Sequence, residues 1–184
     1  AYLPILGVNE DIDLMIYNRS PEPLKFIQKQ YRIENGTTSL VDLINQKPQV
    51  AFVLTSPASH FNMVKQLLQN GIDVFVEKPA TYYSHETQEL AELADKNDLI
   101  LMVGFNRRYA PLHVKVKRIW GDTPVKMGIF QKLRTFPSHP SLWHQLAVDT
   151  IHQIDILRFF CGEAQADKIT QEATPDHFLG AVGT

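Results

Sequence analysis

The chain has 184 residues, 44% of them hydrophobic, enough for one core or for one core and part of a second. With 18 basic and 20 acidic residues dispersed along it, the chain lacks the strongly basic balance of a nucleic-acid-binding protein. The single cysteine, Cys161, excludes an internal disulfide and a cysteine-based metal cluster. No signal peptide is visible and no apolar run approaches the ~20 residues of a membrane span, so we expect a cytoplasmic protein with no membrane partner.

Helical and strand patterns alternate along the first hundred residues. This order predicts parallel strands joined by right-handed crossovers, with helices on both faces of the sheet, which is a doubly wound α/β fold. Ser20 and Ser59 are expected to cap two of the helices. The predicted helices cover residues 1–6, 21–31, 39–45, 60–70 and 84–94, and the predicted strands cover 12–17, 50–54, 74–76 and 99–103.

The pattern changes after Gly104, and we place a domain boundary there, with one domain at residues 1–105 and a second, α+β domain at 106–184. A polar loop is followed by a predicted helix at residues 112–120 and a loosely alternating strand at 124–134. Residues 146–160 have a helical pattern. We expect its apolar side chains to face inward, namely Ile151, Ile154, Leu157 and Phe160. The last twenty residues have no clear pattern.

Each predicted strand of the first domain ends in polar or conformationally special residues. In a doubly wound sheet these ends converge on one crevice, where ligands bind. Lys78 is held in extended geometry there because Pro79 follows it. A Lys-Pro pair after a strand is, taken alone, also compatible with a simple solvated turn. The residues that we expect to line the crevice are Asn18, Arg19, Thr55, Ser56, Pro57, Glu77, Lys78, Asn106 and Arg107.

Arg19 bears on which dinucleotide would bind, NADP or NAD. If the ligand is a dinucleotide, an acid at this position reads a free ribose 2′-hydroxyl, whereas an arginine accommodates a 2′-phosphate, so the pattern favours NADP over NAD. The glycine-rich pyrophosphate loop that should open such a domain is absent, because Gly7 follows the first helix rather than preceding it. Either the chain does not bind a dinucleotide, or residues before Ala1 are not represented; the half helix at the start favours the latter.

Asp149 and His152 stand three residues apart on the last predicted helix and therefore on one face, with Asp155 a further turn along. A histidine beside a carboxylate can move a proton near neutral pH, although such a pair is also common as a surface or core pair without function. A metal site built from His139, His144, His152 and Asp149 is an alternative that no recognised ligand spacing supports, and we predict no metal.

Three motifs together resemble the glucose-fructose oxidoreductase, inositol dehydrogenase and MocA family of nicotinamide-dependent oxidoreductases, and most of all its MviM-type members. They are Glu77-Lys-Pro79 after an apolar strand, Val103-Gly-Phe-Asn-Arg-Arg108, and Asp149-Thr-Ile-His152 opening a helix. The resemblance extends from Ala1 to about Gly162. It implies a Rossmann-type dinucleotide-binding domain lacking its first strand and glycine loop, followed by part of a substrate and dimerisation domain.

The resemblance also implies roles for individual residues. Lys78 would hydrogen-bond the substrate oxygen at the reacting carbon, His152 would be the general acid or base, and Asp149 its companion. Glu77 and Asn106 would contact the nicotinamide ribose, Arg107 would lie on the nicotinamide side, and residues 55–57 would line the path from adenosine to pyrophosphate.

The expected function is hydride transfer between NADP or NAD and a sugar, inositol or related polyol, by a protein that forms homo-oligomers. Many relatives carry Asp-x-Gly-x-His, whereas here the spacing is three and the glycine is lacking. A nucleotide-binding regulator or scaffold without catalysis is therefore the alternative, and a metal-dependent hydrolase that uses the histidines is a further one.

Overall fold

A computed structural model describes residues 2–131, 145–163, 165, 169–173 and 178–183. Within these ranges every helix is too short or too polar to cross a lipid bilayer. The helices are α1 (Leu3–Leu6), α2 (Pro21–Tyr31), α3 (Leu40–Asn45), α4 (Pro57–Gln69), α5 (Ser84–Lys96), η1 (Asn106–Tyr109), α6 (Pro111–Trp120), the π-helical η2 (Gln145–Thr150) and α8 (Ile151–Cys161). The strands are β1 (Met15–Tyr17), β2 (Asn35–Thr37), β3 (Val50–Val53), β4 (Asp73–Val76), β5 (Leu101–Val103), β6 (Ile169–Ala173) and β7 (Phe178–Gly183).

The first five strands are all parallel, as the alternation of helices and strands predicts, and the fold is α/β. They form two groups, the pair β1–β2 and the three-stranded sheet β3–β4–β5. Strand β2 is absent from our prediction because Asn35-Gly36-Thr37 has the composition of a turn. The glycine instead marks a close approach of helix α2, since a Cβ on Gly36 would lie 2.7 Å from Nε2 of Gln28.

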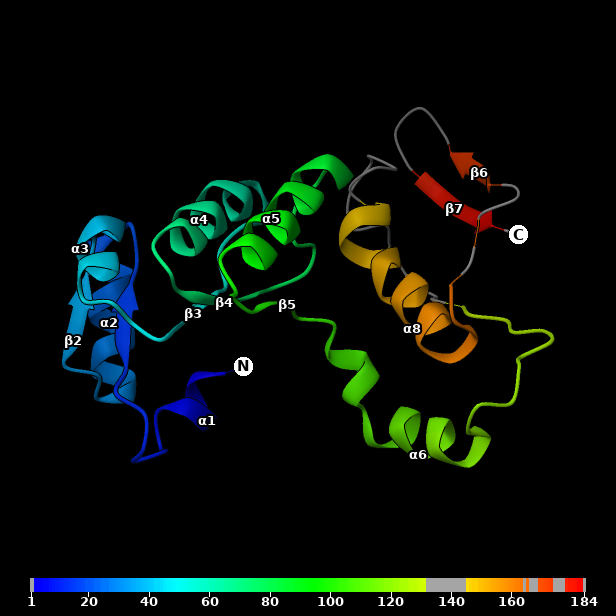
Figure 1. The fold of residues 1–184 in the computed structure, drawn as a ribbon, viewed down its shortest axis with the longest axis horizontal. Coiled ribbons are helices and arrows are strands. Elements are labelled where there is room, and N and C mark those ends of the chain that lie inside the picture. Colours follow the sequence, from blue (N-terminus) through cyan, green and yellow to red (C-terminus); the bar gives the residue numbers. More distant parts are fainter. Residues whose placement is uncertain (1, 132–144, 164, 166–168, 174–177, 184) are drawn as a thin grey trace.

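Helices α4 and α5 lie side by side on one face of the three-stranded sheet (Figure 1). Alternate residues of a strand point to opposite faces, so Val74 and Val76 face these helices while Phe75 faces away. The core between sheet and helices consists of side chains that are 6% exposed or less, namely Val53, Val64, Leu67, Leu68, Ile72, Val74, Val76, Ala80, Leu90 and Ala94. This core holds the carboxyl ends of β3 and β4 in fixed register.

The opposite face of that sheet carries stacked aromatic rings. Phe52 and Phe75 stack with their centroids 5.0 Å apart, and Tyr2 meets the Phe75 ring edge-on at 5.3 Å. Within the described part of the chain this face is covered less than the other, because Phe52 and Met102 are 39% and 40% exposed.

Two local predictions are wrong. Helix α4 begins at Pro57 with Ser56 as the N-cap residue, so Ser59 lies inside the helix; proline at the first helical position fixes the start upstream. Residues 124–131, expected to form most of a strand, are not in one, because alternation alone supplies no hydrogen-bonding partner and none of the described strands pairs with them. Helix α6 matches its prediction.

The inward face of helix α8 differs from our prediction at one of four positions, since Ile151, Leu157 and Phe160 are half-buried. Ile154 is 49% exposed, whereas His152, Asp155 and Ile156 are buried. The apolar residues do not decide the rotation of the helix, because its polar face is bonded to the rest of the protein, as the next subsection describes. The hairpin of β6 and β7, to which we assigned no structure, is antiparallel.

Candidate functional site

The carboxyl ends of β3, β4 and β5 leave the sheet at one edge. Val53 is paired with Val76, and Val76 with Val103, so the segments that follow these three residues begin side by side. Those segments carry Thr55 to Pro57, Glu77 and Lys78, and Asn106 and Arg107. Hydroxyl, carboxylate, ammonium, amide and guanidinium groups therefore come from three adjacent strands to one side of the sheet.

The Glu77 carboxylate is engaged through both oxygens. Its Oε1 accepts a 2.6 Å hydrogen bond from the Tyr2 hydroxyl, and its Oε2 accepts one of 3.2 Å from the backbone N–H of Lys78. Burial, and then the hydrogen bond and the negative charge of Glu77, raise the pKa of Tyr2 to about 12. A Cβ on Gly104 would lie 3.0 Å from Cζ of Phe75 and 3.4 Å from Cα and Cδ of Glu77, so a larger residue here would press on the Phe75 ring beside this carboxylate.

The Lys78 side chain reaches the second half of the chain. Its ammonium donates a 2.8 Å hydrogen bond to the carbonyl oxygen of Val148, seventy residues away. Val148 directly precedes Asp149 and lies four residues before His152. The tip of β4 is thus joined to the segment that carries the predicted acid–base pair.

Asp149, His152 and Asp155 are spaced by three residues and are all buried, with 8%, 8% and 4% of their surfaces exposed. Asp155 pairs with Arg108: its Oδ1 accepts hydrogen bonds of 2.7 Å from Nε and 2.5 Å from Nη2. Asp155, first through its hydrogen bond and then through its charge, raises the pKa of Arg108 against the opposing effect of burial. The pair fixes α8 against η1, which follows the last strand of the sheet.

The remaining predicted residues are placed as follows. Asn18 and Arg19 follow β1, which belongs to the other parallel pair, so their approach to Lys78 stays a prediction. The Asn18 side chain accepts a 2.9 Å hydrogen bond from the backbone N–H of Ser20, and Arg19 is exposed. The Thr55 hydroxyl is 2.8 Å from that of Ser59, and Pro57 opens α4.

Three residues near this edge are missing from the predicted site. Tyr2 gives no local signal, because its partner Glu77 is 75 residues away. His60 gives one: it lies on the apolar stripe of α4, four residues before Val64, where a polar side chain needs a specific partner. Arg108 lies within the quoted motif, but its partner Asp155 is 47 residues distant.

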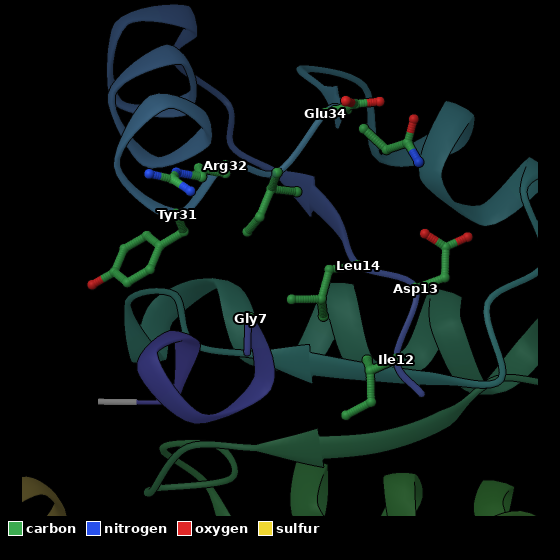
Figure 2. Close-up of a pocket in the computed structure, with 9 residues that line it drawn as sticks. Gly7, Ile12, Asp13, Leu14, Tyr31, Arg32 and Glu34 are labelled. Atoms are coloured by element: carbon green, nitrogen blue, oxygen red, sulfur yellow. The ribbon is translucent and has the colours of Figure 1, made fainter. Parts of the chain in front are cut away.

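A pocket of about 240 Å³ lies beside the amino ends of β1 and β2 (Figure 2). Its lining includes Leu14, directly before β1, and Glu34, directly before β2, together with Gly7 and Tyr31. Leu14 and Glu34 stand at the amino ends of their strands, whereas ligands of open α/β sheets bind beyond the carboxyl ends. The pocket is therefore separate from the candidate site.

Metal ligation finds no support in the described part of the chain, where no group of three or more His, Cys, Asp or Glu side chains is arranged to hold an ion. His139 and His144, two members of the alternative metal set, lie outside the described residues.

Comparison with known proteins gives consistent matches. Residues 12–105 match the family described as "Oxidoreductase family, NAD-binding Rossmann fold". The protein YceM of Salmonella typhimurium is 37% identical over 165 residues, which cover 88% of this chain and 52% of YceM. The scyllo-inositol 2-dehydrogenase (NAD(+)) of Bacillus subtilis is 26% identical over 144 residues, covering 74% of this chain and 42% of that protein. The crystal structure of the dehydrogenase MviM from Clostridium difficile superimposes with a TM-score of 0.83 at 26% identity, over 100% of this chain and 60% of that one. The chain thus spans about half the length of the curated relatives that it matches.

Proposed function

Because this chain belongs to the oxidoreductase family with an NAD-binding Rossmann fold, we propose that it carries out hydride transfer between a nicotinamide cofactor and a hydroxyl of a sugar, inositol or related polyol. The polyol class is suggested by the inositol dehydrogenase among its relatives. The division of the chain at residue 105, between a cofactor-binding and a substrate-binding part, belongs to the same proposal.

The chemistry of the site fits a dinucleotide. The hydroxyls of Thr55 and Ser56, the amide of Asn106 and the guanidinium of Arg107 come from segments that leave the same edge of the sheet, and such groups match ribose hydroxyls and phosphates. Glu77 would stand beside the nicotinamide ribose. Arg19, exposed after β1, would meet a 2′-phosphate, which favours NADP over NAD. A bound nicotinamide supplies the acceptor or donor of the hydride.

Lys78 would hold the oxygen of the reacting carbon. An ammonium group has three N–H donors, and within the described part of the chain one of them is used, by the Val148 carbonyl, so the others can bind a substrate oxygen. A cation in this position stabilises the negative charge that develops on the oxygen as its proton leaves.

His152 would take the hydroxyl proton, with Asp149 orienting the substrate or the imidazole. Both side chains are buried, which keeps competing water away from the proton transfer. The spacing of three residues is shorter than in many relatives, and Asp149 lies in the π-helical η2 whereas His152 lies in α8.

One observation carries the proposal, namely the 2.8 Å bond from the Lys78 ammonium to the Val148 carbonyl. It brings the cation at the tip of β4 to the turn that leads into Asp149 and His152. Hydride transfer between a carbinol carbon and a nicotinamide needs these two kinds of group close together.

The test is reduction of NADP and NAD by a panel of polyols and sugars, followed by absorbance of the reduced nicotinamide, with the purified full-length protein. Replacing Lys78 with alanine should lower turnover by about a hundredfold or more while cofactor affinity is retained. Lys65→Ala is the matched control, because Lys65 lies on the surface of α4 and pairs with Glu89. Unchanged turnover in Lys78→Ala would contradict its role, and cofactor binding without turnover on any substrate would favour a nucleotide-binding regulator.

A further inference from the structure

His60 is a fully buried histidine that no step of the proposed reaction uses. It lies in the first turn of α4, in line with Val64 and Leu68, and 0% of its surface is exposed. A polar ring in this place is stable only if hydrogen bonds replace those that it would make with water.

Both ring nitrogens of His60 face backbone carbonyl oxygens. Nδ1 lies 2.8 Å from the carbonyl oxygen of Pro79, and Nε2 lies 3.0 Å from that of Thr55. A carbonyl oxygen only accepts hydrogen bonds, whereas a neutral imidazole has one N–H and one bare nitrogen. A neutral ring would therefore set a lone pair against one of the two oxygens, and only the imidazolium donates to both.

We infer that His60 is a buried imidazolium that braces the segment after β3 to the segment after β4. The charged side chains on the segment after β4 and on the next turn of α4 have partners of their own: Lys78 is bonded to Val148, Glu77 to Tyr2, and Lys65 to Glu89. The two carbonyl groups are thus what holds the positive ring in place.

Because it braces these two segments, His60 is a positioning residue for Lys78. This role rests on the proposed function. Thr55 opens the segment expected to hold the cofactor, and Pro79 directly follows Lys78. Fixing these two carbonyls to one ring sets the distance between the cofactor segment and the backbone that carries the Lys78 ammonium.

The protonation state is tested on the unmodified full-length protein, labelled with ¹⁵N-histidine, by long-range ¹H–¹⁵N spectra at neutral pH. We expect both ring nitrogens of His60 to carry protons, with its signals assigned in the unmodified protein by through-bond correlation to the His60 backbone. His113 serves as the reference in the same spectrum, because its Nδ1 faces the single carbonyl of Arg107 at 2.7 Å. A His60 ring with one bare nitrogen would overturn the inference, and this result does not depend on any activity or on the folding of a variant.

The positioning role is tested with His60→Gln, whose amide supplies a donor for one carbonyl only. We expect kcat to fall between about tenfold and a hundredfold while KM for the polyol changes little, because the displaced group acts in the reaction step. His85→Gln is the control, since His85 is exposed on α5 and stacks on Tyr83. An unchanged kcat would overturn the positioning role. Absence of dehydrogenase activity in the unmodified protein would instead count against the proposed function, and the spectra would still decide the charge of His60.

Discussion

Replacing Arg108 with alanine is expected to destabilise the docking of α8 by about 3 kcal/mol, the lower end of the cost of removing one partner from a buried ion pair. The Asp155 side chain is 3% exposed and would be left as an uncompensated charge. We take the lower end because the Arg108 side chain is 35% exposed, so water already screens part of the attraction. The contact of its guanidinium with the Phe159 ring, 5.9 Å from the centroid, would be lost as well.

The assay is hydrogen exchange of the backbone amides of α8 in the full-length protein, which reports the local free energy of opening. A loss of 3 kcal/mol corresponds to roughly a hundredfold faster exchange in α8, with α4 and α5 unchanged. Arg158→Ala is the control on the same helix. Its partner is Glu163, and with side-chain exposures of 50% and 84% this pair should contribute no more than about 1 kcal/mol.

Asp155 is more deeply buried than Arg108, and this difference gives a second comparison. Asp155→Asn removes the buried charge and leaves the half-exposed Arg108, which can regain water, so it should cost clearly less than Arg108→Ala. Equal exchange rates in Arg108→Ala and Arg158→Ala, or a larger loss in Asp155→Asn, would refute the reasoning from burial.

Two further predictions concern the edge of the sheet. The pKa of Tyr2, raised from 10.0 to about 12, means that the folded protein keeps this proton where the unfolded chain has lost it. The resulting stability is complete below pH 10 and is lost as pH rises toward 12, so Tyr2→Phe should flatten the alkaline part of an unfolding titration; an identical slope in both proteins would contradict this. Arg19→Ala should weaken binding of NADP by roughly tenfold to a hundredfold, the worth of one charge-assisted hydrogen bond, and leave NAD binding unchanged, as measured by calorimetry. Arg118→Ala, on the exposed side of α6, is the control, and an equal loss for both cofactors would remove the argument for NADP.

The sequence was sufficient for four of the five parallel strands and for most helices, because these depend on local periodicity and on residues such as Pro21 that fix a helix start. It misplaced the start of α4, which begins at Pro57 rather than after Ser59. It failed at β2, where a glycine that admits helix α2 has the composition of a turn. It failed again at residues 124–131, where a strand pattern has no neighbouring strand among the described residues. In both places the outcome depends on a partner that local sequence does not contain.

The candidate site was likewise predicted only in part. The polar residues after β3, β4 and β5 could be gathered from the sequence because parallel strands end at a common edge. The bonds that lock them in place could not, since they join residues far apart in the chain, as Tyr2 joins Glu77 and Lys78 joins Val148. A local sequence pattern cannot show that Tyr2 bonds to Glu77, which lies 75 residues later.

Helix α8 shows why bonds between residues far apart in the chain matter for function. Its apolar pattern predicts the inward face only in part, because Ile154 is half exposed while His152 and Asp155 are buried. The cost of burying these polar groups is offset by bonds to groups outside the helix, Arg108 for Asp155 and the Lys78 ammonium for the preceding turn. The rotation of α8, and with it the direction of His152, is therefore set by the same segments that carry the proposed cofactor and substrate contacts. If this is right, Arg108→Ala should impair turnover more than cofactor binding, although Arg108 touches neither Lys78 nor His152 in any of the described contacts.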